Sequence, residues 1–320
     1  MEAFRFRYHS LELQARDFDI LQGLHESRLY TLDHIAALYF SGQREYAKKR
    51  IRQLKGTELI DERPRRPTQP AVMHLTRTGY ELLASHGYLA GLPSLSLAKF
   101  ENRVRVSPLT LTHELAVLDC KAAIVPAINA LPGYSVAEFS TWPAKYQFSA
   151  RNLHGESVTV KPDGFIRVHE ELDGQIREHR FFLEVDRSTE VLQTLATRAA
   201  CYLDYYRSGS FAAFMGADRA NFKRFPFRVA MVFRSAERRN NIAERLLSAT
   251  PPILTMTWLT TMNELMSDPL GTIWLTPRGY RDAVEGTAYA MKLGRSNWWQ
   301  QEERGQSALV DARIIKRKLF

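Results

Sequence analysis

The feature of this chain that most constrains its fold is the order of patterned segments in its first ninety residues. Three stretches carry apolar residues at helical spacing, and these are residues 17–25, 32–39 and 43–55. Two short apolar runs, 59–60 and 72–76, flank a basic tip that contains prolines, and a helical stretch at 76–85 closes the region. Two short strands around such a tip form a hairpin, so this order predicts a winged helix-turn-helix domain over residues 1–90.

The third helical stretch and the tip carry an excess of positive charge. Residues 43–66 contain nine Lys or Arg against four Asp or Glu, in a chain of net charge +9. Ala47, Ile51 and Leu54 mark the inner face of the helix, and the outer face carries Arg44, Lys48, Lys49, Arg52 and Lys55. An outward basic helix fits the major groove of duplex DNA. The basic residues predicted to bind DNA are Arg44, Lys48, Lys49, Arg52, Lys55, Arg63, Arg65 and Arg66. A solvated charged face and a protein-docking module are the alternatives.

The rest of the chain is predicted to hold one larger domain. Residues 91–106 lack a sustained period and are predicted to be a linker. Strand-like runs and helical stretches alternate between residues 107 and 289, and the main ones are 107–127, 134–140, 158–168, 180–186, 189–206, 227–233 and 236–247. This order predicts an α+β or α/β domain with a mixed sheet flanked by helices. A basic tail, residues 290–320, follows it.

Two carboxylates end the apolar strand predicted at 180–186. Alternation along a strand puts Glu184 and Asp186 on one face, and Asp163 joins them if the preceding strand pairs alongside. Clustered carboxylates repel one another unless a cation compensates, and their oxygens suit Mg²⁺ or Mn²⁺. Such an ion polarises a phosphodiester and activates water. Arg198 lies on the apolar face of the next helix and would offset the negative charge or contact a phosphate.

These motifs carry a resemblance. A Pro-Asp pair at 162–163, then a strand that ends in Glu-x-Asp, then a helix, resembles the PD-(D/E)xK nuclease superfamily. More narrowly, the string FLEVDRSTE at 182–190, preceded by a winged helix, resembles the replication-relaxation family, over roughly residues 17–275. Members of that family are linked to plasmid replication and to relaxation of plasmid DNA. The resemblance implies a winged helix followed by a nuclease-like domain.

Carried over residue by residue, the resemblance implies catalytic roles. Asp163 and Glu184 match the acidic metal ligands, and Glu114 matches a further acid in the helix that opens the domain. The chain departs from the motif at Asp186, which stands where the superfamily has a lysine. Arg198 and Lys161 are the candidates to replace that lysine, although arginine is a poor proton carrier. A structural ion-pair network is the competing interpretation of Glu184, Asp186 and Arg198.

The predicted function is therefore that of a DNA-binding protein of plasmid or mobile-element replication or mobilisation, with metal-dependent nicking as its possible activity. The alternative is a non-catalytic regulator whose degenerate nuclease-like domain dimerises or recruits a partner, such as a relaxase or a replication protein. A nuclease of a defence system is a third hypothesis. The expected partner is double-stranded DNA, and a homo-oligomer is left open.

The sequence also predicts where the protein acts. No apolar run approaches the roughly 20 residues that cross a bilayer, and the first residues lack an apolar signal core. We therefore expect a cytoplasmic protein with no membrane partner. Cys120 and Cys201 do not have the spacing of a zinc site or a redox pair, which predicts buried reduced thiols.

Overall fold

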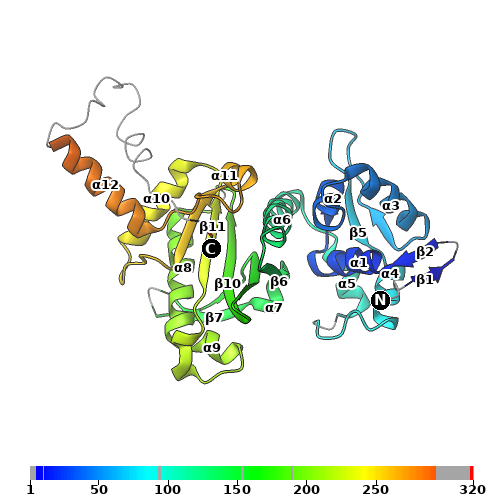
Figure 1. The fold of residues 1–320 in the computed structure, drawn as a ribbon, viewed down its shortest axis with the longest axis horizontal. Coiled ribbons are helices and arrows are strands. Elements are labelled where there is room, and N and C mark those ends of the chain that lie inside the picture. Colours follow the sequence, from blue (N-terminus) through cyan, green and yellow to red (C-terminus); the bar gives the residue numbers. More distant parts are fainter. Residues whose placement is uncertain are drawn as a thin grey trace. The chain divides into compact units, whose positions relative to one another are not determined.

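The computed structural model describes residues 5–9, 11–92, 95–152, 155–188, 190–292 and 318–319 (Figure 1). Contacts divide the chain into two compact units. The first comprises Met1–Pro126 and Ser140–Lys145, and the second comprises Ala127–Phe139 and Tyr146–Phe320. Most of the basic tail predicted at 290–320 lies outside the described residues. Among the described helices, none is long and apolar enough to cross a membrane.

The helices of the first unit begin and end close to where the apolar spacing predicted them. They are α1 (Ala15–Ser27), α2 (Leu32–Tyr39), α3 (Arg44–Gly56) and α4 (Arg77–Ser85). Threonines cap two of them. The Thr31 hydroxyl accepts a hydrogen bond from the His34 amide at 3.2 Å, and the Thr76 hydroxyl accepts one from the Gly79 amide at 3.1 Å. Each bond satisfies an amide that has no partner within its helix.

A small antiparallel sheet completes this part of the unit. Its strands are β3 (Tyr30–Thr31), β5 (Val72–Leu75) and β4 (Ile60–Glu62), paired in that order. The sequence predicted the β4–β5 hairpin but not β3, because two residues show no periodicity. It also missed an N-terminal hairpin of β1 (Arg5–Tyr8) and β2 (Leu11–Gln14), whose four-residue strands are too short for a clear alternation.

The first unit extends beyond the predicted boundary at residue 90. The region 91–106, predicted to be a linker, contains α5 (Leu97–Arg103), whose Phe100 is buried in the core of this unit. Seven residues make only two turns, which leaves little periodic signal. Helix α6 (Pro108–Asn129) follows, and its residues up to Pro126 belong to the first unit. Cys120 in α6 is free and buried, as is Cys201 in the second unit, which confirms both predictions.

The second unit is built on a five-stranded mixed sheet, which confirms the predicted fold class. The strand order is β12 (Thr257–Thr261), β11 (Arg228–Phe233), β10 (Gln175–Asp186), β9 (Gly164–Leu172) and β6 (Tyr134–Ser140). Strands β9 and β10 are antiparallel, whereas β10, β11 and β12 are parallel. Helix α8 (Leu192–Arg207) follows β10, and helix α10 (Ala236–Leu247) follows β11.

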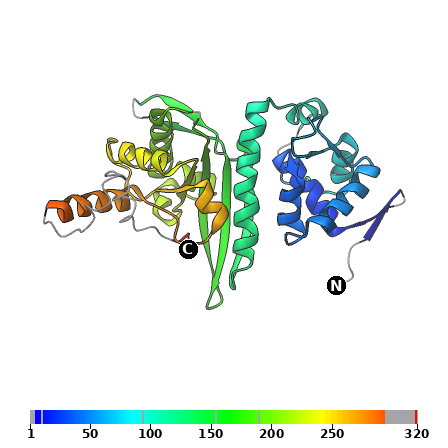
Figure 2. The same cartoon turned by 90° about the horizontal axis from the view of Figure 1, so that it is seen from above.

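Apolar side chains of α8 and α10 cover one face of this sheet. Leu195 and Tyr202 of α8 and Leu246 of α10 share a core with Phe182 of β10 and Met231 of β11. Figure 2 shows the yellow helix α10 on one side of the sheet. The remaining elements are α7 (Pro143–Tyr146), α9 (Ser210–Phe214), the 3-10 helix η1 (Arg219–Arg224), α11 (Met262–Ser267) and α12 (Pro277–Lys292).

One predicted strand is divided in two. The run at 158–168 forms β8 (Ser157–Val160), which pairs with β7 (Phe148–Arg151), and then the separate strand β9. Residues 161–163 between them are not in a strand. Pro162 lacks the amide hydrogen that a continuous ladder requires, which accounts for the interruption. Lys161 is consequently exposed, and the regular alternation that would align it with Asp163 is absent.

Candidate functional site

Helix α3 has one apolar face and one basic face. Ala47, Ile51 and Leu54 are buried in the core of the first unit, as predicted. The opposite face is polar and open to solvent, and its exposed basic residues are Arg44, Lys48, Lys49 and Arg52. Because the buried residues fix the rotation of the helix, the basic side chains project away from the core.

The basic residues of this face differ in their partners. Arg44 Nε lies 2.6 Å from Asp33 Oδ1, and Lys48 Nζ lies 3.8 Å from Glu45 Oε2, in pairs that are at least half exposed. Exposed ion pairs contribute little and are screened by salt. Lys49 and Arg52 have no acidic partner among the described residues. These two cations are therefore available to a negatively charged ligand.

The basic residues at the tip of the β4–β5 hairpin also include both engaged and available side chains. Arg63 donates to the backbone carbonyls of Val104 and Val106, the latter at 3.1 Å, so its guanidinium is engaged inside the unit. Glu62 accepts from both Lys55 (2.9 Å) and Arg65 (2.6 Å). Arg66 is exposed and has no acidic partner within the part of the chain that the structure describes. Of the predicted tip residues, Arg66 is the most accessible to a ligand.

In the second unit, Glu184 lies on β10 with only 3% of its side chain exposed. Arg198 of α8 donates to Oε2 at 2.8 Å, and the Tyr202 hydroxyl donates to Oε1 at 2.5 Å. Burial raises the pKa of Glu184 to about 7, and the nearby charge of Asp163 adds to that rise, while the Arg198 charge opposes it. The predicted approach of Arg198 to the sheet carboxylate is thus observed.

The other predicted acids also have partners. Asp163 Oδ2 accepts a hydrogen bond from the Val185 amide at 2.8 Å. The Asp186 carboxylate accepts from Arg238 of α10, with Nη2 3.1 Å from Oδ1, and from the Ser188 amide at 3.2 Å. The sequence did not identify Arg238, which is 52 residues away along the chain. The carboxylates of Asp163, Glu184 and Asp186 therefore all accept hydrogen bonds from guanidinium, hydroxyl or backbone amide groups.

The carboxylates of Asp163, Glu184 and Asp186 are not arranged to bind the Mg²⁺ or Mn²⁺ ion that the resemblance implies. Within the described ranges, no group of three or more His, Cys, Asp or Glu side chains is placed to hold a metal ion. Both oxygens of Glu184 are engaged, and one contacts the positive guanidinium of Arg198, which would repel a divalent cation. No catalytic step through a metal follows from this arrangement.

Glu114, the further acid that the resemblance implied, belongs to the first unit. It lies in α6, and its Oε1 accepts a hydrogen bond from Nη2 of Arg28. Arg28 is the residue that directly follows α1. Both side chains are largely buried, with 15% of Glu114 and 20% of Arg28 exposed. This ion pair connects α6 to the end of α1.

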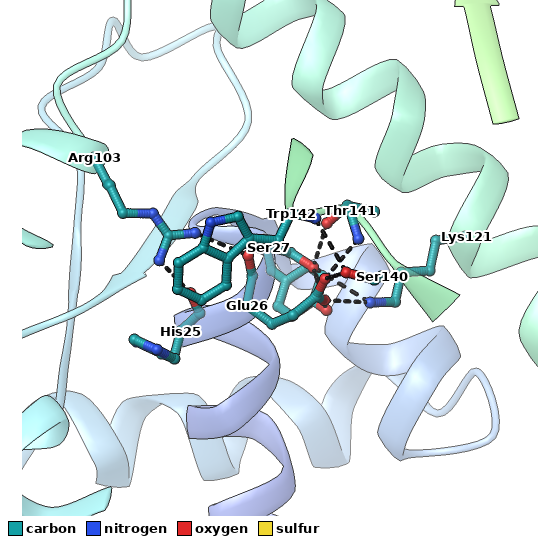
Figure 3. A network of polar contacts seen from close by, with 9 residues as sticks. His25, Glu26, Ser27, Arg103, Lys121, Ser140, Thr141 and Trp142 are labelled. Atoms are coloured by element: carbon teal, nitrogen blue, oxygen red, sulfur yellow. Dashed lines mark hydrogen bonds and ion pairs between the residues drawn. The ribbon is translucent and has the colours of Figure 1, made fainter. Parts of the chain in front are cut away.

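The sequence also missed a buried polar network at the end of α1 (Figure 3). Glu26 Oε2 accepts from Lys121 Nζ at 2.8 Å, while Oε1 accepts from the Ser140 hydroxyl at 2.9 Å and the Thr141 amide at 2.5 Å. Burial alone would raise the pKa of Glu26, but the Lys121 charge and these hydrogen bonds outweigh it and lower the pKa. The network holds the segment Ser140–Lys145 in the first unit.

Arg103 closes the same network. Its guanidinium donates to the carbonyls of His25 (2.8 Å) and Glu26 (3.0 Å), which lie in the last turn of α1, and stacks over the Trp142 ring at 3.9 Å. Burial, together with the Arg103 charge, lowers the pKa of His25 to about 4, so this imidazole is neutral at pH 7. No sequence pattern marks these residues, because their partners are up to 115 positions apart.

One of three comparisons with known proteins gives a match. The family model described as Replication-relaxation matches residues 21–217, which is more than half of the 320 residues. The match begins in α1 and ends just after α9, so it includes α3, Glu184 and Arg198. No curated protein and no solved structure matches the chain.

Proposed function

Because this chain belongs to the replication-relaxation family, we propose that it is a duplex-DNA-binding protein of plasmid or mobile-element replication or mobilisation. The first unit acts as a winged helix, with α3 in the major groove and the β4–β5 hairpin beside the backbone. The observation that carries the proposal is the outward basic face of α3, on which Lys49 and Arg52 have no acidic partner among the described residues.

The dimensions and charges of α3 support this role. Its 13 residues span about 20 Å. An α-helix with its side chains is about 10–12 Å in diameter, which fits the roughly 12 Å wide major groove. Asp33 and Glu45, the partners of Arg44 and Lys48, are exposed, so phosphate groups can replace them at low cost. Phosphate contacts by these four cations would release counterions, which makes binding steeply dependent on salt.

We propose a structural role for the carboxylates of the second unit. Glu184, Arg198 and Tyr202 form a satisfied buried network that joins β10 to α8, and Asp186 with Arg238 joins the end of β10 to α10. The protein then acts as a non-catalytic DNA-binding accessory, and strand cleavage is left to a partner such as a relaxase or replication protein. Metal-dependent nicking that requires Glu184 is the competing function, and its detection would contradict this assignment.

The test is selection of a duplex site from a random library, followed by fluorescence anisotropy. We expect Lys49→Ala/Arg52→Ala to weaken binding at least about tenfold and to reduce the salt slope by about 1.8, since each lost phosphate contact removes about 0.9. The control Arg77→Ala/Lys99→Ala removes the same charge from exposed positions on α4 and α5. Equal losses in both variants would mean that net charge, and not the α3 face, accounts for binding.

A further inference from the structure

The second unit contains a half-open cavity that the proposed function does not use. It has a volume of about 640 Å³ and lies beside the first half of β10 and the last turns of α8. The segments that enter β11 and β12 complete its wall, with residues such as Pro226 and Met256. Glu184 and Asp186 occupy the opposite, carboxyl end of β10 and do not line the cavity.

The wall of the cavity is strongly basic. Its charged residues, apart from His179, are Arg177, Arg180, Arg207, Arg228 and Glu178. Arg180 Nε lies 2.6 Å from Glu178, and Arg177 Nη1 lies 3.4 Å from Glu170. Arg207 and Arg228 have no acidic partner among the described residues. The cavity therefore holds more guanidinium groups than the surrounding carboxylates neutralise.

Arg228 is the most informative of these residues. Its guanidinium carbon lies 4.7 Å from the centre of the Trp258 ring and 5.7 Å from that of Phe181. The aromatic contacts hold the side chain in place and remove part of its hydration, and this burial lowers the pKa of Arg228. A fixed and partly dehydrated cation without a carboxylate partner is well suited to bind an anion.

The cavity also has an aromatic and apolar floor. Tyr206 is half-buried, and its ring is perpendicular to that of buried Phe227 at a centroid distance of 5.9 Å. Leu203 and Met256 also line the cavity, and both side chains are partly exposed. A ring held in this way offers a face on which a planar base can stack. Cations beside an aromatic platform are the arrangement by which proteins bind unpaired nucleotides.

We propose that this cavity binds single-stranded DNA, with phosphates on Arg207 and Arg228 and one base stacked on Tyr206. The cavity volume is that of a small-molecule pocket, which admits an unpaired nucleotide but not a duplex. The choice of DNA as the ligand rests on the proposed function, and replication and relaxation both expose single strands. The protein then contacts duplex through the first unit and an unpaired strand through the second.

The experiment measures binding of a fluorescein-labelled oligo(dT) of about 20 nucleotides by anisotropy, with the full chain. All proteins carry Lys49→Ala/Arg52→Ala, so that the α3 face contributes little. Arg207→Ala/Arg228→Met should weaken binding at least about tenfold and reduce the salt slope by about 1.4, because each phosphate contact on a single strand accounts for about 0.7. Tyr206→Leu should weaken binding at least about fivefold through loss of stacking.

The matched control is Arg234→Ala/Arg245→Ala, which removes two exposed arginines of the same unit. Arg234 follows the opposite end of β11 from Arg228, and Arg245 contacts Gln193 at the opposite end of α8 from Arg207. The control should bind as the parent does. An equal loss in the control, or no loss in the cavity variant, overturns the proposal. Tighter binding of oligo(rU) than of oligo(dT) overturns the choice of DNA, and displacement by thymidine monophosphate as effective as by the oligonucleotide overturns the choice of a strand.

The two proposals can fail separately. If Lys49→Ala/Arg52→Ala leaves duplex binding unchanged while the cavity variant loses oligo(dT), the α3 assignment is wrong and the cavity assignment stands. If the reverse is found, only the cavity assignment is wrong. Circular dichroism of the Arg228→Met protein checks that the variant folds, since the methionine retains an apolar side chain between Trp258 and Phe181.

Discussion

The two units use clustered charge in opposite ways. On α3, Lys49 and Arg52 project into solvent without an acidic partner among the described residues. On β10, Glu184 is buried and both of its oxygens accept hydrogen bonds. The sequence offered a functional interpretation for both clusters, from spacing along α3 and from alternation and a family resemblance along β10, with a structural ion-pair network as the alternative for the second. The difference shows that a charge cluster predicts a ligand only when its partners along the rest of the chain are known.

The largest expected effect tests whether buried charge is structural. Lys121→Met removes the cation that neutralises Glu26 and leaves this carboxylate, only 14% exposed, without its ion pair. We expect the free energy of unfolding to fall by about 3–5 kcal/mol, the usual cost of breaking a buried pair. Urea denaturation of the full chain measures it. A loss below about 1 kcal/mol would mean that Glu26 is solvated and the network is not a core element.

A somewhat smaller effect is expected from Glu184→Leu, at about 2–4 kcal/mol. The substitution leaves Arg198 without one of its two carboxylate partners, since Glu190 still accepts from Nη2 at 2.9 Å. The desolvation that raises the pKa of Glu184 also shows that its charge is costly to bury, so part of the loss is recovered. Glu171→Ala, an exposed position on β9, should change stability by less than about 0.5 kcal/mol.

The folding stability of the protein should also depend on pH because Glu184 is buried. The pKa of Glu184 is raised from 4.5 to about 7 in the folded state, so the folded protein binds this proton more tightly than the unfolded chain. That contribution is fully present below pH 4.5 and is lost as the pH rises through about 7. Urea titrations across this range should show a fall in stability that is absent from Glu184→Gln. Parallel curves for the two proteins would remove Glu184 as the cause.

The smallest effect on stability belongs to the exposed face. Arg52→Ala should change the free energy of unfolding by less than about 0.5 kcal/mol, because the side chain has no described partner to lose. The affinity of the Arg52→Ala protein for the selected duplex should nevertheless fall severalfold. If denaturation showed a loss above about 1 kcal/mol, Arg52 would have a structural contact and the contrast between the units would weaken.

The sequence predicted local features better than distant ones. Periodicity located α3 and its buried residues Ala47, Ile51 and Leu54. Alternation put Glu184 and Asp186 on one face of β10, and these side chains contact Arg198 of α8 and Arg238 of α10. The short helix α5 and the two-residue strand β3 carry too few residues for a period to be visible. The partners Arg238 of Asp186 and Lys121 of Glu26 could not be predicted, because only tertiary folding brings them together.

The most direct test compares wild type, Lys49→Ala/Arg52→Ala and Glu184→Gln on the same selected duplex, and then on supercoiled plasmid with Mg²⁺ or Mn²⁺. We expect only the α3 variant to lose duplex affinity, by at least about tenfold, and none of the three proteins to nick the plasmid. Nicking by wild type that Glu184→Gln lacks would contradict this expectation, because Glu184 would then be a catalytic residue and not part of a structural network.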